Sequence, residues 1–197
     1  MSFKESLAQG RVAETYIAKW LMSRGASVMP AYEIEKSRFA GPQLFTKDNS
    51  FIAPDLLVFQ TKGMLWVEAK HKSVYTWHRN SKQWTTGIDL HHYGQYMHVS
   101  KQTQIPVWLL FFHREDTPAS GDIRQGCPEK CPTGLFGGEL FSLISQENHR
   151  SPPITRVGEE STGHGKSGMV YWAECSLKKI ASKEDFLSVA DMQEGDA

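Results

Sequence analysis

The chain has 197 residues, 40% of them hydrophobic and 22% charged, which is typical of a globular protein of one domain. No run approaches the roughly 18 apolar residues of a membrane helix, and the charged N-terminal stretch lacks the apolar core of a secretory signal, so we expect a cytoplasmic protein with no membrane partner. The three cysteines argue against a disulfide-linked scaffold, and the formal net charge of zero means that any nucleic-acid binding needs a locally positive surface.

The N-terminal segment predicts a helix over about residues 3–24. Val12, Tyr16 and Trp20 recur at a spacing of four residues, which places them on one helix face. Gly25 follows in the position where a left-handed cap would end the helix.

A strand and a β-hairpin are expected next. Residues 27–34 have the composition of a strand, and 38–50 form a connection that contains Gly, Pro and Asn. Two apolar runs, 54–60 and 64–70, flank a short turn with glycine at 61–63, which is the pattern of a hairpin.

A second helix and a buried strand follow the hairpin. The helix is predicted over about residues 89–102, with Asp89 as its N-cap, and the apolar run at 106–113 predicts the strand. The resulting order, α-β-β-β-α-β, indicates an α/β protein with a mixed sheet flanked by helices. We assign residues 1–113 to this core.

The remaining residues, 114–197, are expected to extend the same domain as a loop-rich segment. Residues 115–138 are rich in Gly, Pro and Asp and predict a long loop. Two further strands are expected at 139–145 and 169–175, and a short helix near 183–190.

The hairpin brings together three charged residues that interrupt apolar runs. Side chains alternate along a strand, so Glu68 and Lys70 point to one face. With a turn centred on Lys62-Gly63, paired residue numbers sum to 125, which sets Asp55 opposite Lys70 and Leu57 opposite Glu68. Asp55, Glu68 and Lys70 then share one face and one end of the hairpin.

Such a group suits phosphodiester chemistry. Two neighbouring carboxylates repel each other, and a hard divalent cation such as Mg²⁺ neutralises them. A bound cation polarises a phosphoryl oxygen, and a lysine adds positive charge where the transition state is negative. The alternative is a set of solvated residues on a half-exposed hairpin, which explains one charge more easily than three.

The motif Pro54-Asp55, then Glu68-Ala69-Lys70, resembles the signature of the PD-(D/E)xK (restriction-endonuclease-like) nuclease superfamily, and the order of elements over residues 3–113 is similar to that family's core. The resemblance implies that Asp55 and Glu68 bind Mg²⁺, for which Mn²⁺ would substitute, with the Ala69 carbonyl as a third ligand. It further implies that Lys70 assists the nucleophile, that DNA is the substrate, and that a homodimer is a compatible assembly.

Two helical residues are candidates by the same resemblance. Members similar to archaeal Holliday-junction resolvases and RecB-type nucleases carry a glutamate in the first helix that completes the metal site, which implies this role for Glu14. The alternative is a surface glutamate paired with Arg11. Gln95 lies where exonuclease-like relatives carry a Gln-xxx-Tyr motif, and it is a candidate DNA contact, although Val99 stands in the tyrosine position.

The segment that leaves the motif strand combines basic and aromatic residues, with no acidic residue between Glu68 and Asp89. Basic groups neutralise phosphates, and exposed aromatic rings stack on unpaired bases. The alternative is a solvated loop whose tryptophans fold back onto the core. The candidate DNA-binding residues here are Lys72, Trp77, Arg79, Lys82 and Trp84.

Cys127 and Cys131, with His149, His164 and Cys175 downstream, admit a structural Zn²⁺ site. Such sites favour closer spacings and four clear ligands, so we expect loop cysteines instead. The leading hypothesis is therefore a Mg²⁺-dependent deoxyribonuclease. The rivals are a non-catalytic nucleic-acid-binding module that retains the nuclease fold, and an interaction or zinc-dependent domain centred on residues 115–165.

Overall fold

The computed structural model describes residues 3–31, 42–153 and 168–191. The helices are α1 (Phe3–Ser23), α2 (Leu90–Thr103), α3 (Ser120–Arg124), α4 (Leu140–Ile144) and α5 (Lys183–Asp191), with a 3-10 turn η1 (Glu174–Ser176). The strands are β1 (Ser27–Pro30), β2 (Gln43–Phe45), β3 (Ser50–Ile52), β4 (Leu56–Gln60), β5 (Gly63–Lys72), β6 (Thr76–His78), β7 (Gln83–Asp89), β8 (Val107–His113), β9 (Gly134–Glu139), β10 (Glu147–Ser151), β11 (Met169–Ala173) and β12 (Lys178–Ala181).

A six-stranded mixed sheet forms the centre of the molecule, with strand order β1-β4-β5-β8-β9-β12. The β5–β8 pair is parallel and its neighbours pair antiparallel. A second, four-stranded sheet has the order β10-β11-β7-β6, and β2 pairs with β3. The expected α/β class, with a mixed sheet flanked by helices, is confirmed. The expected core order appears as α1-β1-β4-β5-α2-β8, with β2–β3 and β6–β7 as insertions.

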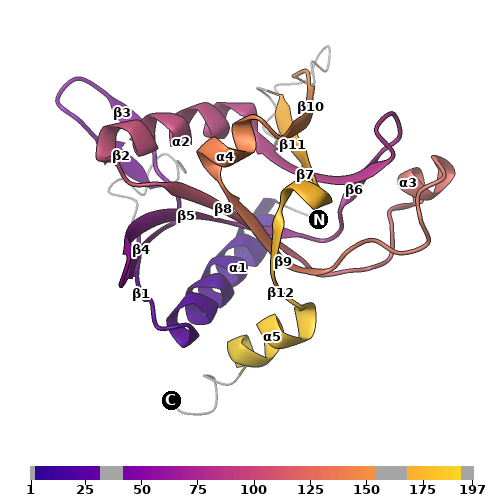
Figure 1. Cartoon of the computed structure of the whole chain (residues 1–197), viewed down its shortest axis with the longest axis horizontal. Coiled ribbons are helices and arrows are strands. Elements are labelled where there is room, and N and C mark those ends of the chain that lie inside the picture. Colours follow the sequence, from indigo (N-terminus) through magenta and orange to yellow (C-terminus); the bar gives the residue numbers. More distant parts are fainter. Residues whose placement is uncertain (1–2, 32–41, 154–167, 192–197) are drawn as a thin grey trace.

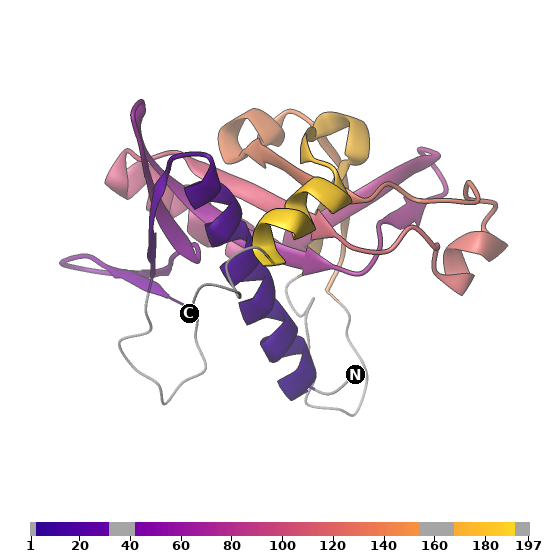
Figure 2. The same ribbon diagram turned by 90° about the horizontal axis from the view of Figure 1, so that it is seen from below.

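The central sheet has apolar side chains on both faces. One face packs against α1 and α5, where Ile17, Trp20 and Phe186 are buried against Val58 and Phe112. Figure 2 shows these two helices lying across that face. The other face carries the second sheet, α2 and α4, as Figure 1 shows. The strands of the core are therefore apolar almost throughout, because both faces are covered.

Helix α2 begins and ends as its residues dictate. The Asp89 carboxylate accepts a hydrogen bond from the His91 N–H (2.8 Å), which caps the first turn. Gln104 ends the helix in the left-handed conformation, with φ 57°. The buried residues Tyr93, Tyr96 and Val99 turn one face of the helix toward the core.

The predicted strand over 139–145 is wrong. Glu139 ends β9, and its carboxylate accepts hydrogen bonds from the N–H groups of Phe141 and Ser142, which begins helix α4. Leu140 and Leu143 are buried at a helical spacing of three, so the apolar residues of this segment follow a helix period rather than a strand period.

The long loop expected over 115–138 contains α3 and most of β9. Glycine is depleted in strands, so the glycine-rich sequence of β9 does not predict a strand. Here Gly137 is required, because a Cβ at this position would overlap the Leu110 side chain and the Leu109 carbonyl on β8. Strands β9 and β12, both from the C-terminal part of the chain, lie in the same sheet as β5 and β8.

Other boundaries also differ from expectation. Strand β1 ends at Pro30, and the expected continuation over 32–34 lies outside the described residues. Strands β10 and β12 were not expected, and the stretch after the motif strand contains the β6–β7 hairpin rather than one open loop. In residues 3–31, 42–153 and 168–191, no helix is both long and apolar enough to cross a membrane.

Helix α5 joins the C-terminal segment to the core through Phe186. This side chain is fully buried, with its ring centroid 4.4 Å from that of Phe112 on β8 and 6.0 Å from that of Trp20 on α1. We predict that Phe186→Ala lowers the free energy of unfolding by about 3–5 kcal/mol, because it opens a cavity between the helices and the sheet. Urea unfolding measures this change, and the exposed Ser188→Ala is the matched control. A loss below about 1 kcal/mol would contradict this packing.

Candidate active site

The hairpin that carries the charged motif turns one residue earlier in the chain than expected. Gln60 pairs with Gly63, so paired residue numbers sum to 123 rather than 125 and the turn is Thr61-Lys62. Asp55, which precedes β4, therefore lies across from Glu68, and the predicted pairing with Lys70 is wrong. The shift of two residues preserves the alternation of faces, so the three charged residues still share one face.

A backbone hydrogen bond fixes Asp55 beside the motif strand. Its Oδ2 accepts from the Ala69 N–H at 2.9 Å, which joins the start of β4 to β5. The Ala69 side chain itself points to the α1 face and is buried. The motif therefore presents its charges to one face of the sheet while its apolar residues fill the other.

Glu68 is the most buried charged residue of the group. Its side chain is only 1% exposed, and it forms an ion pair with the Lys70 ammonium, whose side chain is 31% exposed. Neither carboxylate oxygen of Glu68 has a hydrogen-bond donor of regular geometry in the described part of the chain. A buried carboxylate costs several kcal/mol unless it is compensated, so this position favours a cation.

The carboxylates of this group lie close enough together to shift the pKa values of Asp55 and Lys70. Burial raises the pKa of Asp55 well above its ordinary value of 3.8, and the charges of Glu68 and Glu14 raise it further, while Lys70 and the Ala69 N–H oppose the shift. Burial by itself lowers the pKa of Lys70, but the Glu68 and Asp55 carboxylates outweigh it and hold this pKa above its ordinary value. Lys70 is therefore a permanent cation at neutral pH.

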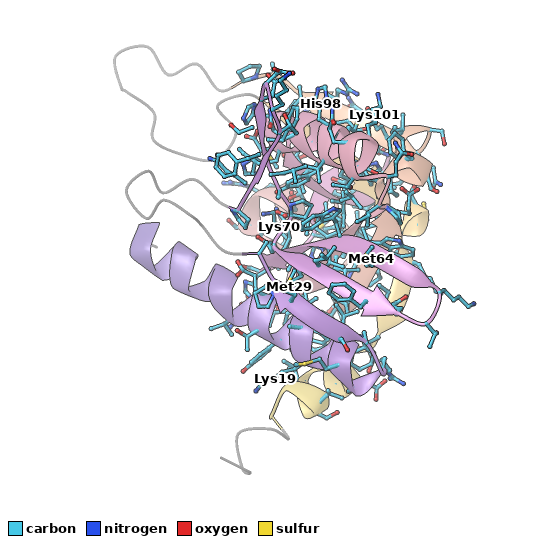
Figure 3. All side chains as sticks on the ribbon, turned by 90° about the vertical axis from the view of Figure 1, so that its left-hand side faces the viewer. Lys19, Met29, Met64, Lys70, His98 and Lys101 are labelled. Carbon is cyan, nitrogen blue, oxygen red and sulfur yellow. The ribbon has the colours of Figure 1, made fainter. Side chains whose placement is uncertain are left out.

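Glu14 of α1 belongs to the same electrostatic group. Its charge raises the pKa of both Asp55 and Lys70, which requires it to lie near the carboxylate end of the hairpin. Helix α1 packs along β5, and this packing brings the first-helix glutamate to the motif. In Figure 3, Lys70 lies between α1 and the helix that carries His98 and Lys101, which is α2.

Helix α2 adds two residues that were not predicted as site residues. Tyr96 is buried, and its pKa is raised by burial and then by the charges of Glu68 and Asp55, so its phenol faces the carboxylates. The pKa of His92 is lowered by burial and by the charge of Lys70, and its ring lies 5.8 Å from that of Tyr96. His92 and Tyr96 are four residues apart and therefore lie on the same face of the helix that follows the motif, which is the sequence pattern that could have indicated them.

Gln95 makes a contact within the protein. Its Oε1 accepts a hydrogen bond from the Ile52 N–H at 3.1 Å, which fastens the β2–β3 hairpin to α2. Gln95 therefore has a structural partner, and its expected DNA contact stays a prediction.

The candidate DNA-binding residues separate into two groups. Trp84 is 9% exposed and belongs to the core, so the expectation that it offers an exposed stacking surface is wrong. Trp77 packs edge-on against Trp84 with ring centroids 5.1 Å apart. Both rings fold back onto the core because β6 and β7 pair at this position. Arg79 and Lys82 are exposed at the β6–β7 turn, and Lys72 continues the charged face of β5 beyond Lys70.

The surroundings of two cysteines, Cys127 and Cys131, disfavour the thiolate through burial and nearby aspartates. The buried Cys131 thiol donates to the Glu115 carbonyl at 3.2 Å, and burial raises the pKa of both Cys131 and Cys127. A raised thiol pKa opposes the thiolate that binds zinc. The third cysteine, Cys175, is exposed and accepts a hydrogen bond from Gln83. His164 lies outside the described residues.

Within the described ranges, no three His, Cys, Asp or Glu side chains are grouped so as to hold a metal ion. The donor set for a divalent cation is instead two opposed carboxylates, Asp55 and Glu68. The burial of the Glu68 carboxylate and the raised pKa of Asp55 both fit a hard cation between them.

No protein-family model matches the chain, and no curated protein matches its sequence. Among solved structures, it is similar to Hjc, a Holliday junction resolvase of Archaeoglobus fulgidus, with a TM-score of 0.45 and 9% sequence identity. The similarity covers 90% of this chain and 99% of that chain. A likeness of this size carries no information about chemistry.

We predict that Asp55→Asn stabilises the protein at neutral pH. Because the pKa of Asp55 is raised on folding, its stability contribution is complete below the ordinary value of 3.8 and is lost as pH rises through the folded pKa. Asparagine keeps the acceptor for the Ala69 N–H but removes the charge, so we expect a gain of about 0.5–2 kcal/mol at pH 7.

Thermal unfolding between pH 4 and pH 8 measures this gain, which corresponds to a Tm increase of about 2–4 °C per kcal/mol. The exposed Asp48→Asn is the control and leaves Tm unchanged. A lower Tm for Asp55→Asn at pH 7 would show that the carboxylate is not under electrostatic stress.

Proposed function

We propose that the chain is a metal-dependent deoxyribonuclease that hydrolyses phosphodiester bonds at the Asp55–Glu68–Lys70 group. The observation that carries the proposal is the burial of Glu68 beside Asp55, where its carboxylate faces the Lys70 ammonium and the Tyr96 phenol. Structural ion pairs do not need a second buried carboxylate of like charge, whereas a cation site does. The resemblance of the motif to PD-(D/E)xK nucleases supports the same chemistry.

In this proposal, Asp55 and Glu68 hold Mg²⁺ together with the Ala69 carbonyl, and Glu14 completes the ligand set, directly or through water. When bound, the cation polarises the phosphoryl group and lowers the pKa of water at the site. Asp55 is oriented for this role by the hydrogen bond from Ala69, and Tyr96 limits the access of water to the inner side of Glu68.

Lys70 acts as a fixed positive charge. With its pKa held above the ordinary value, its ammonium does not remove a proton at neutral pH. It stabilises negative charge on the attacking oxygen and on the phosphorane-like transition state, and its ion pair with Glu68 fixes its position before substrate arrives. Lys72, Arg79 and Lys82 extend this positive surface along the path of the DNA backbone.

We predict that Glu68→Gln, Asp55→Ala and Lys70→Ala each reduce cleavage of DNA by about a hundredfold to a thousandfold or more, the usual effect of losing one preorganised charged group. Supercoiled plasmid, linear duplex and a four-way junction are incubated in Mg²⁺, in Mn²⁺ and in EDTA. The exposed Glu129→Gln and the hairpin-turn Lys62→Ala are the matched controls and retain activity.

The cleavage assay, together with a measurement of DNA binding, distinguishes a nuclease from a non-catalytic nucleic-acid-binding module. Full activity in any of the three site variants would refute the assignment of that residue. Binding of DNA by the unchanged protein without cleavage in either metal would favour the nucleic-acid-binding module.

A second prediction concerns Lys72. Burial, and then the charge of Lys70, lower the pKa of Lys72 to about 8. Its ammonium therefore loses its charge as pH rises from 7 to 9, and we expect DNA affinity to fall over this range.

Lys72→Gln should bind DNA more weakly at pH 7 and show a smaller decline toward pH 9, with a salt slope lower by about one. Fluorescence anisotropy with a labelled duplex measures both, and the exposed Lys101→Gln is the control that retains the decline. If the DNA affinity of Lys72→Gln fell as steeply between pH 7 and pH 9 as that of the unchanged protein, a group other than Lys72 would cause the decline.

A further inference from the structure

Three aromatic rings from three different strands are stacked on the four-stranded sheet. The His149 ring of β10 lies between His78 of β6 and Tyr171 of β11. The centroids are 3.8 Å and 4.4 Å apart, and the planes differ by 8° and 6°. All three side chains are partly exposed. We call this group the histidine stack.

A chain of hydrogen bonds fixes the protons of both imidazoles. Ser81 Oγ donates to Asn148 Oδ1 at 3.3 Å, so the same hydroxyl oxygen accepts from His78 Nδ1 at 2.8 Å. Asn148 Oδ1 also accepts from His149 Nδ1 at 2.9 Å. The Asn148 amide is oriented by its donation to Gln83 at 2.6 Å. Both rings therefore carry hydrogen on Nδ1, and both Nε2 atoms are the ones that take up a proton.

The two Nε2 atoms are open to a ligand. No described residue is hydrogen-bonded to either atom. Both ring nitrogens of His113, by contrast, are buried without a hydrogen-bond partner among the described residues. Among the described residues, no third His, Cys, Asp or Glu completes a metal-binding group with them. The chemistry on offer is one or two N–H donors on an imidazolium, which suits an anionic oxygen.

The charged neighbours of the stack are mostly positive. Arg79 and Lys82 are exposed at the β6–β7 turn. On β10, Arg150 is neutralised by Glu147, which also accepts from Tyr93. The 3-10 turn η1 contributes Glu174 and the uncharged Cys175, the latter bonded to Gln83. Arg79 and Lys82 form no ion pair with another described residue, so both charges are available to an anion at the turn.

We propose that the histidine stack and the β6–β7 turn form a second contact for the DNA backbone, in which His78 or His149 donates an Nε2–H to a phosphate oxygen. This inference rests on the proposed function. The turn is within reach of the same duplex, because the eight residues from Lys70 to His78 span at most about 29 Å, less than the roughly 34 Å of one duplex turn.

Binding at this contact takes up a proton. The pKa of His149 is lowered by burial and by the neighbouring His78, so its imidazole is neutral at pH 7 in the free protein. A phosphate at Nε2 favours the imidazolium, and the Tyr171 face on the other side of His149 stabilises it further. DNA should therefore bind more tightly as pH falls, by up to about tenfold per pH unit for one linked proton.

The test compares variants in a Glu68→Gln background in EDTA, so that no cleavage occurs. Anisotropy of a fluorescein-labelled 20-bp duplex is measured from pH 5.5 to pH 7.0, below the range in which Lys72 titrates. Calorimetry in two buffers of different ionisation enthalpy counts the protons taken up on binding. The variants are His78→Gln/His149→Gln and, as a control, His98→Gln, an exposed histidine on α2 that stacks on Phe51.

We expect the parent and His98→Gln to gain about three- to tenfold in affinity from pH 7.0 to pH 6.0 and to take up about one proton. The double variant should lose most of this gain and the proton uptake. A double variant that keeps both would overturn the inference, while cleavage by the unchanged protein would leave the proposed function standing. A parent that binds the duplex at no pH would also overturn the inference, and only the failure of the unchanged protein to cleave DNA in either metal would overturn the proposed function.

Discussion

The placement of Glu68 is the constraint on which the rest of the structure depends. A carboxylate that is 1% exposed, next to a second carboxylate, is tolerated only because Lys70 lies against it and the Ala69 N–H holds Asp55 in place. The like charges still act on each other, as the raised pKa of Asp55 shows. Like charges this close together cost stability, and under the proposed function a bound cation would offset that cost.

The two faces of the central sheet have different roles. The face that packs on α1 and α5 is apolar and supplies stability, through residues such as Trp20, Phe112 and Phe186. The opposite face carries Asp55, Glu68 and Lys70 at one end and the apolar cluster beneath the second sheet at the other. Helix α2 crosses between them, so that Tyr96 belongs to the core and to the wall of the site at once.

The second sheet extends the charged face. Strand β5 carries Glu68, Lys70 and Lys72 in succession, and the chain then turns into β6 and the exposed basic turn. Trp77 and Trp84 anchor that hairpin on the core, while His78 turns outward onto His149. The alternation of side chains along a strand thus separates an anchoring face from a face that is available for binding.

The sequence by itself determined the elements whose signals are local. Periodicity placed α1 and α2, apolar runs placed β4, β5 and β8, and strand alternation put Asp55, Glu68 and Lys70 on one face even though the assumed turn was two residues out of register. Tertiary structure decided what depends on distant partners. It formed β9 from a glycine-rich segment by pairing it with β8, where Leu110 leaves no room for a side chain at Gly137. It began α4 where Glu139 caps the helix. It buried Trp84 and brought Glu14, His92 and Tyr96 to the carboxylates. Residues so far apart in the sequence meet only after the chain has packed, and no local pattern encodes that meeting.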